Sequence, residues 1–354
     1  IMAFIEIPNV RIAGVSAAVP KRVKEIKDLP FFAEGEAEKV IALTHVERSR
    51  IVPEGMVCSD LCYEAAEKLI AELGWDKGEI DGLIFVSLSR DYITPATAAV
   101  LQDRLGLSQE CYAIDIPLAC SGYLYGLSVA SSLVTASGLK KVLLLVGETT
   151  SLLQSPQDKV LWPLHGDAGT ATALQYDENA EPMKFNLRTD GSRAQAIINT
   201  DGGVRNPVTE DSLVYREYEP GVIRNRVQST MDGLGVFGFS VKEPPASILD
   251  LCSHYGIDID AIDYLILHQA NKYMDDKIAK KVKVPLEKVP FSLMQYGNTS
   301  SATIPVTTVV CLHEEVQKRK VATIACGFGS GLSWASASLV FDNIVCPPLI
   351  EVGE

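Results

Sequence analysis

The sequence has no apolar run of the roughly 18 residues that a membrane-spanning helix needs, so no membrane segment is expected. No basic stretch followed by an apolar one occurs near the N-terminus, and no secretory signal is expected. The 8 cysteines form no CxxC pair, which predicts reduced thiols in a cytoplasmic protein. His313 lacks the second histidine of a zinc-binding helix, so no metal site is expected. The net charge of −13 argues against nucleic acid as a partner.

The length and composition allow a large buried core. The chain has 354 residues, of which 47% are hydrophobic, enough for one large domain or two ordinary ones. Apolar runs predict strands at Val10–Val15, Gly82–Ser87, Cys111–Ile116, Lys141–Gly147, Thr170–Tyr176, Tyr264–Leu267, Val321–Ala325 and Ser333–Phe341. Helical patterns occur at Cys58–Leu73, Thr97–Leu105, Ser121–Ser137, Ala246–Tyr255, Lys272–Val282 and Ile304–Lys318. This alternation indicates a layered α/β architecture.

Two segments about half a chain apart resemble each other. Leu73–Ile84 and Tyr255–Ile266 each join the end of a helix to a strand through a glycine and a short acidic stretch. The similarity predicts an internal duplication, with an N-terminal half over residues 1–177 and a C-terminal half over residues 178–354. Asp177–Val227 is rich in Gly, Asn, Arg and Pro, and is interpreted as a connection with loops.

Cys120 lies where a predicted strand turns into a predicted helix. The run Tyr112–Ile116 is followed by small residues, and the helical pattern begins at Ser121. The free N–H groups and the positive dipole end of a helix start favour a thiolate. Cys120 is therefore predicted to be a nucleophile, whereas the other cysteines are interpreted as inert structural residues.

Two more polar residues stand at the edges of predicted elements. His268 ends the strand Tyr264–Leu267, and Asn298 precedes the helix that begins near Ile304. Open α/β sheets place their sites at the ends of strands. Cys120, His268 and Asn298 can therefore meet in one crevice.

Four motifs in one order carry a family resemblance. They are Ala119–Gly122, Leu267–Asn271, Gly297–Ser300 and Gly327–Gly331. Together they resemble the β-ketoacyl-acyl-carrier-protein synthase III family, in the thiolase-like superfamily, across nearly the whole chain. The resemblance implies a five-layered αβαβα sandwich of two similar halves, a homodimer, and an acyltransferase that initiates fatty acid or related chain synthesis.

The resemblance also implies a role for each site residue. Cys120 accepts an acyl group from acyl-coenzyme A or an acyl-carrier-protein donor, and the N–H groups of Cys120 and Ser330 form an oxyanion hole. His268 and Asn298 stabilise the enolate left when malonyl-acyl carrier protein loses carbon dioxide, and that enolate attacks the acyl-cysteine. No cofactor takes part, because coenzyme A enters only as a thioester substrate.

The same resemblance places further residues around the substrates: Lys159, His165, Ile197, Ser229, Met231, Phe237, Asn271 and Phe328. Several depart from the family pattern. Lys159 stands where an arginine is expected beside the adenine of coenzyme A, and a lysine cannot stack as a guanidinium does. His165 replaces an aromatic wall residue, and Ser229 and Ser151 fall where leucine is common. Thr94 replaces a bulkier residue that crosses the dimer. These changes predict a longer or more polar pocket and a primer other than acetyl.

Acyl carrier protein is acidic, so an acidic chain needs a local basic patch to bind it. Such a patch is predicted just after His268, at Lys272, Lys277, Lys280 and Lys281. Tyr273 occupies the place of the family's docking arginine. A solvated helix face is the alternative interpretation.

Related activities fit the sequence less well. A 3-hydroxy-3-methylglutaryl-coenzyme A synthase needs a glutamate where Ser89 stands, and a biosynthetic thiolase needs a second cysteine from which Cys326 is one residue out of register. Plant-type polyketide synthases differ around Cys120 and His268. A family member of a specialised lipid, polyketide or surface-glycan pathway stays open, including one that transfers an acyl group without condensation. A non-catalytic scaffold is disfavoured because all three reactive residues are intact.

Overall fold

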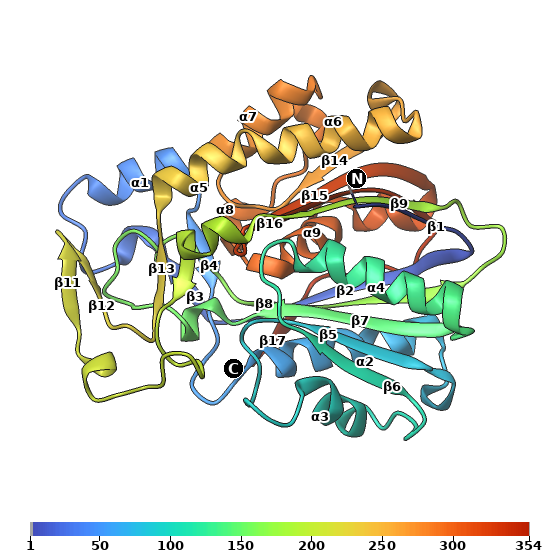
Figure 1. The fold of residues 1–354 in the computed structure, drawn as a ribbon, viewed down its shortest axis with the longest axis horizontal. Coiled ribbons are helices and arrows are strands. Elements are labelled where there is room, and N and C mark those ends of the chain that lie inside the picture. The colour runs from blue at the N-terminus through green and yellow to red at the C-terminus, as the bar shows by residue number, and fades with distance from the viewer. Residues whose placement is uncertain (1–2, 354) are drawn as a thin grey trace.

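The computed structural model describes residues 3–353 and contains two β-sheets packed between helices (Figure 1). The first sheet runs in the order β17 (Ile350–Val352), β2 (Val10–Pro20), β8 (Ala168–Tyr176), β7 (Lys141–Glu148), β5 (Gly82–Val86) and β6 (Tyr112–Ile116). The second runs β1 (Ala3–Ile7), β9 (Met183–Thr189), β16 (Ser333–Asp342), β15 (Lys320–Gly329) and β14 (Tyr264–Leu267).

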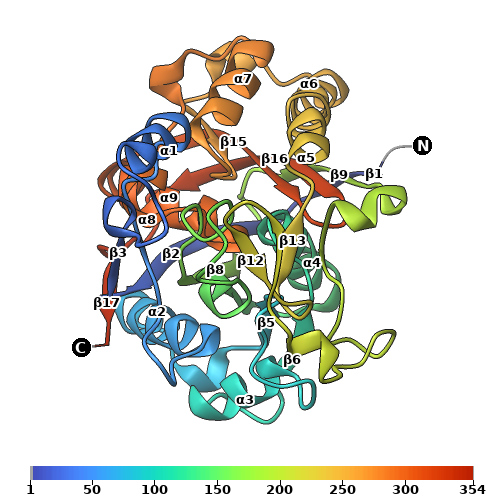
Figure 2. The ribbon, with the colours of Figure 1, turned by 90° about the vertical axis from the view of Figure 1, so that its left-hand side faces the viewer.

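Helices fill three layers around these sheets (Figure 2). The central layer is α4 (Gly122–Ser137) with α9 (Thr303–Lys318), and the outer face of the first sheet carries α2 (Cys58–Leu73) and α3 (Thr97–Arg104). The outer face of the second sheet carries α6 (Glu243–Tyr255) and α7 (Lys272–Val282). α4 contains no charged residue, as suits a helix between two sheets. The predicted five-layered αβαβα sandwich is confirmed.

The two sheets repeat one pattern of strand directions. β5 is parallel to β7, β7 is antiparallel to β8, and β8 is antiparallel to β2. β14, β15, β16 and β9 repeat these directions in the same order. Gly74 and Gly256 end α2 and α6 in the left-handed conformation, and Asp76 and Asp258 each cap the following turn. The sequence repeat therefore corresponds to a structural one.

The ends of the chain cross between the two sheets. β1 pairs with β9 in the second sheet, and β17 pairs with β2 in the first. Each sheet thus includes a strand from the far end of the sequence. The division into halves between residues 177 and 178 stays a prediction.

Every predicted strand and helix is present, although β2 and β15 are longer than expected. The interpretation of Asp177–Val227 as only connection and loops is wrong, because this stretch contains β9, which lies between β1 and β16 in the second sheet. The sequence pattern did not predict β9, because the strand contains polar residues that contact α6 and do not face solvent. Asn186 donates a hydrogen bond to the Ser247 carbonyl, and Arg188 pairs with Asp250 at 2.6 Å.

Several short elements near the site were not predicted. They are α1 (Glu36–Thr44), α5 (Gly233–Ser240), α8 (Leu293–Tyr296), and the paired strands β3 (Val23–Glu25) with β4 (Arg48–Arg50), β10 (Ile197–Asn199) with β13 (Ser229–Met231), and β11 (Arg216–Glu219) with β12 (Val222–Arg224). Of these, β10, β13 and α5 contribute residues to the cavity described below.

Gly169→Ala should destabilise the fold, because β8 approaches α2 too closely for a side chain. A Cβ atom at Gly169 would lie 2.5 Å from the carbonyl carbon of Leu61 and would also meet the Cys62 amide. Overpacking of this kind costs about 1–3 kcal/mol of the free energy of unfolding. Thermal and urea unfolding should show the loss, whereas Gly191→Ala, in open space, should not. Equal stability of the two variants would contradict this packing.

Candidate active site

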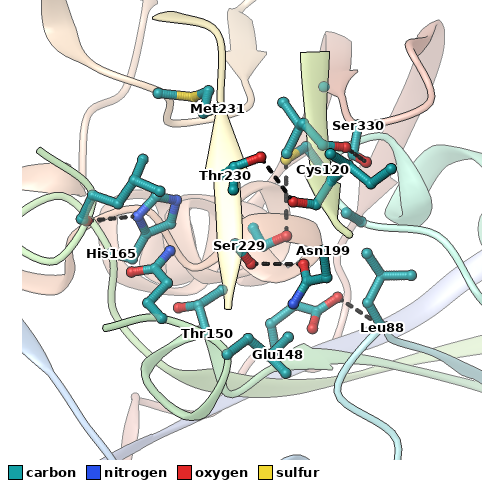
Figure 3. A pocket seen from close by; sticks show the side chains of 18 of the residues that line it. Leu88, Cys120, Glu148, Thr150, His165, Asn199, Ser229, Thr230, Met231 and Ser330 are labelled. Atoms are coloured by element: carbon teal, nitrogen blue, oxygen red, sulfur yellow. Dashed lines mark hydrogen bonds between the residues drawn. The ribbon is translucent and has the colours of Figure 1, made fainter. Parts of the chain in front are cut away.

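Cys120 lies in the short connection between β6 and α4, facing the end of β15 (Figure 3). Its Sγ atom is 3.8 Å from the Ser300 hydroxyl oxygen. The backbone N–H groups of Ser330 and of Cys120 itself also lie near the sulfur, where they act to lower the pKa of the thiol. The two N–H groups that the resemblance assigns to an oxyanion hole therefore converge on the reactive atom.

The charge state of Cys120 differs from the one its helix-start position suggests. Burial raises the pKa of the Cys120 thiol above its ordinary value, and the hydrogen bonds from Ser300 and Ser330 only partly oppose this effect. The negative charge of Glu148 raises the pKa further. At neutral pH the group is therefore a thiol and not a resting thiolate.

Glycines let β15 pack directly against Cys120. A Cβ atom at Gly329 would lie 2.6 Å from the Cys120 sulfur, and one at Gly327 would lie 3.0 Å from the Cys120 carbonyl oxygen. Any side chain at Gly329 would displace the sulfur. The Gly-rich motif therefore has a steric reason at this point in the fold.

His268 is buried at the end of β14. Its Nδ1 atom is 2.8 Å from the hydroxyl oxygen of Thr303, and its ring meets Phe328 edge to face, with 5.3 Å between the ring centroids. Burial, together with nearby His165, lowers the pKa of His268 to about 3. The imidazole is therefore neutral at physiological pH.

Asn298 is fixed by its own turn and by a neighbouring segment. Its Oδ1 atom accepts a hydrogen bond of 2.8 Å from the Ser300 N–H. Its backbone pairs with Leu164 at 2.8 Å and with Gly166 at 3.1 Å. Since Oδ1 is engaged, the amide NH₂ group is oriented as a donor.

These residues line one cavity of about 810 Å³ (Figure 3). The predicted site residues on its wall are Cys120, His268, Asn298, Ser330, His165, Ile197, Ser229, Met231, Asn271 and Phe328. Residues from both halves of the chain thus meet in one space, as the strand-end argument predicts.

Three residues expected at the pocket are placed elsewhere. Lys159 pairs with Glu36 of α1 at 3.0 Å, and Phe237 stacks on Tyr273 with 5.8 Å between centroids. Neither is among the residues that line the cavity. Ser151 was expected on the wall, but its amide donates to Asp167 at 3.0 Å and its hydroxyl to the same carboxylate. Its neighbour Thr150 lines the cavity instead.

Glu148 is a cavity residue that the sequence argument missed. It ends β7 and accepts hydrogen bonds from the Leu88 amide at 2.9 Å and the Ser89 hydroxyl at 2.8 Å. Burial raises the pKa of Glu148 to about 7. The rule that selected His268 at a strand end would have selected Glu148 if it had been applied to β7.

Ser89 and Cys326 occupy or adjoin the positions where the two alternative enzymes need a catalytic residue, and both are engaged elsewhere in the fold. Ser89, which stands where a synthase of 3-hydroxy-3-methylglutaryl-coenzyme A needs a glutamate, is bound to Glu148. Cys326 is fully buried in the core of the second sheet and is not among the residues that line the cavity. The glutamate that lines the cavity is therefore Glu148 and not a residue at position 89, and no cysteine other than Cys120 is among the described residues that line it.

The lysines after His268 lie on α7, which starts beside the cavity. Lys272 pairs with Asp276 at 2.7 Å, and the Lys277 ammonium lies 5.1 Å from the Tyr273 ring centroid. Lys280 and Lys281 are exposed on the last turns of the helix. Three of the four cations therefore point a positive charge to solvent without an acidic partner among residues 3–353.

Residues 3–353 contain neither a candidate membrane span nor a candidate metal site. No helix in this range is long and apolar enough to cross a membrane. No group of three or more His, Cys, Asp or Glu side chains in this range is arranged to hold a metal ion.

Comparison with known proteins places the chain among synthases. Residues 114–191 match the family 3-oxoacyl-[acyl-carrier-protein] synthase III, and residues 252–341 match the C-terminal part of that family. A β-ketoacyl-[acyl-carrier-protein] synthase III of Streptococcus equi subsp. zooepidemicus is 31% identical over 92% of this chain and 97% of its own length.

Solved structures agree with this placement. A 3-oxoacyl-(acyl-carrier protein) synthase from Burkholderia xenovorans LB400 has a TM-score of 0.93 at 35% identity, and the match covers 99% of each chain. The priming β-ketosynthase of the R1128 polyketide pathway has a TM-score of 0.81 at 23% identity, covering 96% of this chain and 98% of its own, and shows a shared fold.

Alkylation of Cys120 by iodoacetamide should follow its raised pKa. Because the thiolate is the reactive form, the rate near pH 7 should be below that of a free thiol. The rate should still be rising at pH values where free cysteine, with a pKa of about 8.5, approaches its plateau. Peptide mass spectrometry against N-acetylcysteine measures this profile, and Cys120→Ser identifies the peptide. A midpoint at or below that of the free thiol would contradict the burial argument.

Proposed function

This chain belongs to the β-ketoacyl-acyl-carrier-protein synthase III family and is a condensing acyltransferase of that type, and we propose that its reaction runs through Cys120, His268 and Asn298. The observation that carries the proposal is that these three side chains line one cavity in which two backbone N–H groups point at the Cys120 sulfur. A neutral histidine and an oriented amide beside a thiol suit decarboxylative condensation.

In the first half-reaction, the Cys120 sulfur attacks the carbonyl carbon of an acyl thioester. A bond from carbon to the Cys120 sulfur forms, the bond to the donor sulfur breaks, and the thiol proton ends on the departing thiol. The N–H groups of Cys120 and Ser330 hold the oxyanion of the tetrahedral intermediate. Both N–H groups lie beside the sulfur, and the oxyanion forms on the carbon that bonds to that sulfur.

In the second half-reaction, malonyl-acyl carrier protein replaces the first donor. Its carboxylate leaves as carbon dioxide, and the electron pair passes to the thioester carbonyl, which becomes an enolate. His268 and Asn298 donate hydrogen bonds to that oxygen. The enolate carbon then attacks the acyl-cysteine, so that a carbon–carbon bond forms, the bond to Cys120 breaks, and the thiolate takes up a proton.

The donor role of His268 requires one tautomer. The ring nitrogen not engaged by Thr303 must carry the proton, so Nδ1 must accept a hydrogen bond. The Thr303 hydroxyl lies 2.8 Å from Nδ1 and 3.0 Å from the Ser300 carbonyl oxygen, and it has one proton to give. In the reactive state we propose that the Thr303 hydroxyl donates its hydrogen bond to Nδ1 of His268 and not to the Ser300 carbonyl oxygen. The low pKa of His268 keeps the imidazole neutral throughout.

We further propose that the protein works as a homodimer. The β6 edge of the first sheet exposes Tyr112 and Ile114, and the nearby loop exposes Tyr92 and Ile93, which is 86% accessible. Unpaired edges and exposed apolar side chains are usual at interfaces between copies. Thr94, the residue expected to cross the dimer, is exposed in the same loop.

The acyl donor is either coenzyme A or an acyl carrier protein. Lys159, which stands where an adenine-contacting arginine is expected, is engaged by Glu36. The polar wall residues Thr150, His165 and Ser229 favour a specialised primer over acetyl. The second candidate is therefore a synthase III-like enzyme of a specialised lipid, polyketide or surface-glycan pathway.

Asn298→Ala should abolish most of the condensation. Removal of one oxyanion donor costs about 10²–10³ in rate, and the loss should appear in carbon dioxide release from malonyl-acyl carrier protein and not in loading of Cys120. Radiolabelled carbon dioxide release, with and without acyl primer, measures this step. Asn179→Ala, in an exposed turn, is the matched control. An acylated wild-type enzyme that releases no carbon dioxide would remove the condensing role.

The double variant Lys277→Glu/Lys280→Glu should raise the KM for malonyl-acyl carrier protein about tenfold, because α7 would repel the acidic partner. The difference from the wild type should shrink in high salt. Lys318→Glu, on α9, is the control for a single charge reversal elsewhere. An unchanged KM would show that the α7 lysines are only a solvated helix face.

A further inference from the structure

One wall of the cavity is polar, with two of its side chains buried and two half-buried. Thr150, Gln154 and His165 lie on the connection between β7 and β8, and Ser229 begins β13. Thr150 is 8% and Gln154 6% exposed. Figure 3 shows Thr150, His165 and Ser229 pointing into the space that Cys120 also faces. We call these four residues the acceptor wall.

Three members of the acceptor wall, Thr150, Ser229 and His165, already use their polar hydrogen in a hydrogen bond to another residue of the protein. The Thr150 hydroxyl donates to the Gly166 carbonyl at 3.0 Å, and the Ser229 hydroxyl donates to Oδ1 of Asn199 at 2.9 Å. Both hydroxyl oxygens keep lone pairs but have no proton left to offer a ligand.

His165 presents an acceptor for a similar reason. Its Nδ1 atom is 3.0 Å from the Leu161 carbonyl oxygen, which can only accept, so the proton lies on Nδ1. Burial lowers the pKa of His165 to about 4, so the ring is neutral. The remaining nitrogen, Nε2, is then a bare acceptor.

Gln154 completes the wall. Its Oε1 atom is buried and has no hydrogen-bond partner in residues 3–353. A buried acceptor without a donor is unfavourable, so a ligand whose donor Oε1 can turn to meet gains more than one that brings only carbon.

The donor should be uncharged. The carboxylates that line the cavity are Glu148 and Asp201. Glu148 is occupied by donors from Leu88 and Ser89, and Asp201 pairs with Arg226 at 2.8 Å. Neither is left to balance an ammonium group, which would be costly to bury alone.

One part of the remaining lining is apolar and suits an aliphatic chain, although Arg90 and Asn199 also line the cavity. Leu153, Leu161, Leu164, Ile197 and Met231 line the same space. We infer that the primer is a hydroxyacyl group, with its carbon chain against these residues and its hydroxyl donating to the acceptor wall. The inference rests on the proposed loading of Cys120 and adds the chemical class of the acyl group.

Matched pairs of thioesters test the inference on the wild-type protein. Butyryl and hexanoyl groups are compared with their 2-hydroxy and 3-hydroxy forms, both enantiomers, and with 4-aminobutyryl. Each is offered on coenzyme A and on acyl carrier protein, and acylation of Cys120 is followed by intact-protein mass spectrometry. At least one hydroxyacyl group should load with a kcat/KM about tenfold or more above its unsubstituted partner.

Two variants connect this preference to the wall. His165→Phe and Gln154→Leu each remove an acceptor while keeping bulk, and each should lower the preference for the hydroxyacyl group severalfold to tenfold. His254→Phe and Gln317→Leu make the same replacements on the exposed surface and should leave the preference unchanged. Thermal melting shows that each variant is folded, and the wild-type comparison stands even if one is not.

The outcomes separate this inference from the proposed function. If Cys120 is acylated but prefers the unsubstituted or the amino acyl group, or makes no distinction, the hydroxyacyl inference is overturned and the acyl transfer stands. If no thioester on either carrier acylates Cys120, the proposed function fails and the inference fails with it.

Discussion

The contact between Gly329 and Cys120 is the constraint on which the site depends. A side chain at Gly329 would reach within 2.6 Å of the Cys120 sulfur, so strand and nucleophile meet with no atoms between them. β15 belongs to the second sheet, whereas Cys120 precedes the helix packed against the first. The sulfur therefore receives the Ser330 N–H only when the two sheets are fully docked. His268 and Asn298 reach the same cavity from the second half, so the whole site is a product of that docking.

Burial sets the charge of the site as well as its shape. It lowers the pKa values of His268 to about 3 and of His165 to about 4, and it raises that of the Cys120 thiol. Near neutral pH these three groups are uncharged in the substrate-free protein. In the proposed reaction, negative charge develops in the oxyanion and the enolate, which the proposed donors face, and passes briefly through the Cys120 thiolate. An arrangement of this kind spends little energy on reorienting its dipoles during reaction.

The sequence predicted most of the architecture, and it selected Cys120, His268 and Asn298, which the structure brings to one cavity. α2, α7 and β14 begin and end at the predicted residues because their apolar periodicity is strong and each stops at a turn. β9 was not predicted because Asn186 and Arg188 form polar contacts with α6. Local periodicity cannot reveal such contacts between distant segments. The surroundings of Lys159 and Phe237 were equally inaccessible, since Glu36 and Tyr273 lie far away in sequence. Whether Thr150 or Ser151 faces the cavity depends on the direction of the chain after β7, which a pattern of residue types does not determine.

The crossing of the two chain ends has a consequence for the order of assembly. β17 pairs with β2, although the other strands of that sheet all precede residue 177. A ribosome that has produced these strands has thus not yet produced the strand that closes the sheet, and the intervening sequence encodes most of the second sheet. Pairings across such separations form slowly. Until then the β2 edge is open, and it is the place where a nascent chain would be most vulnerable to pairing with another molecule.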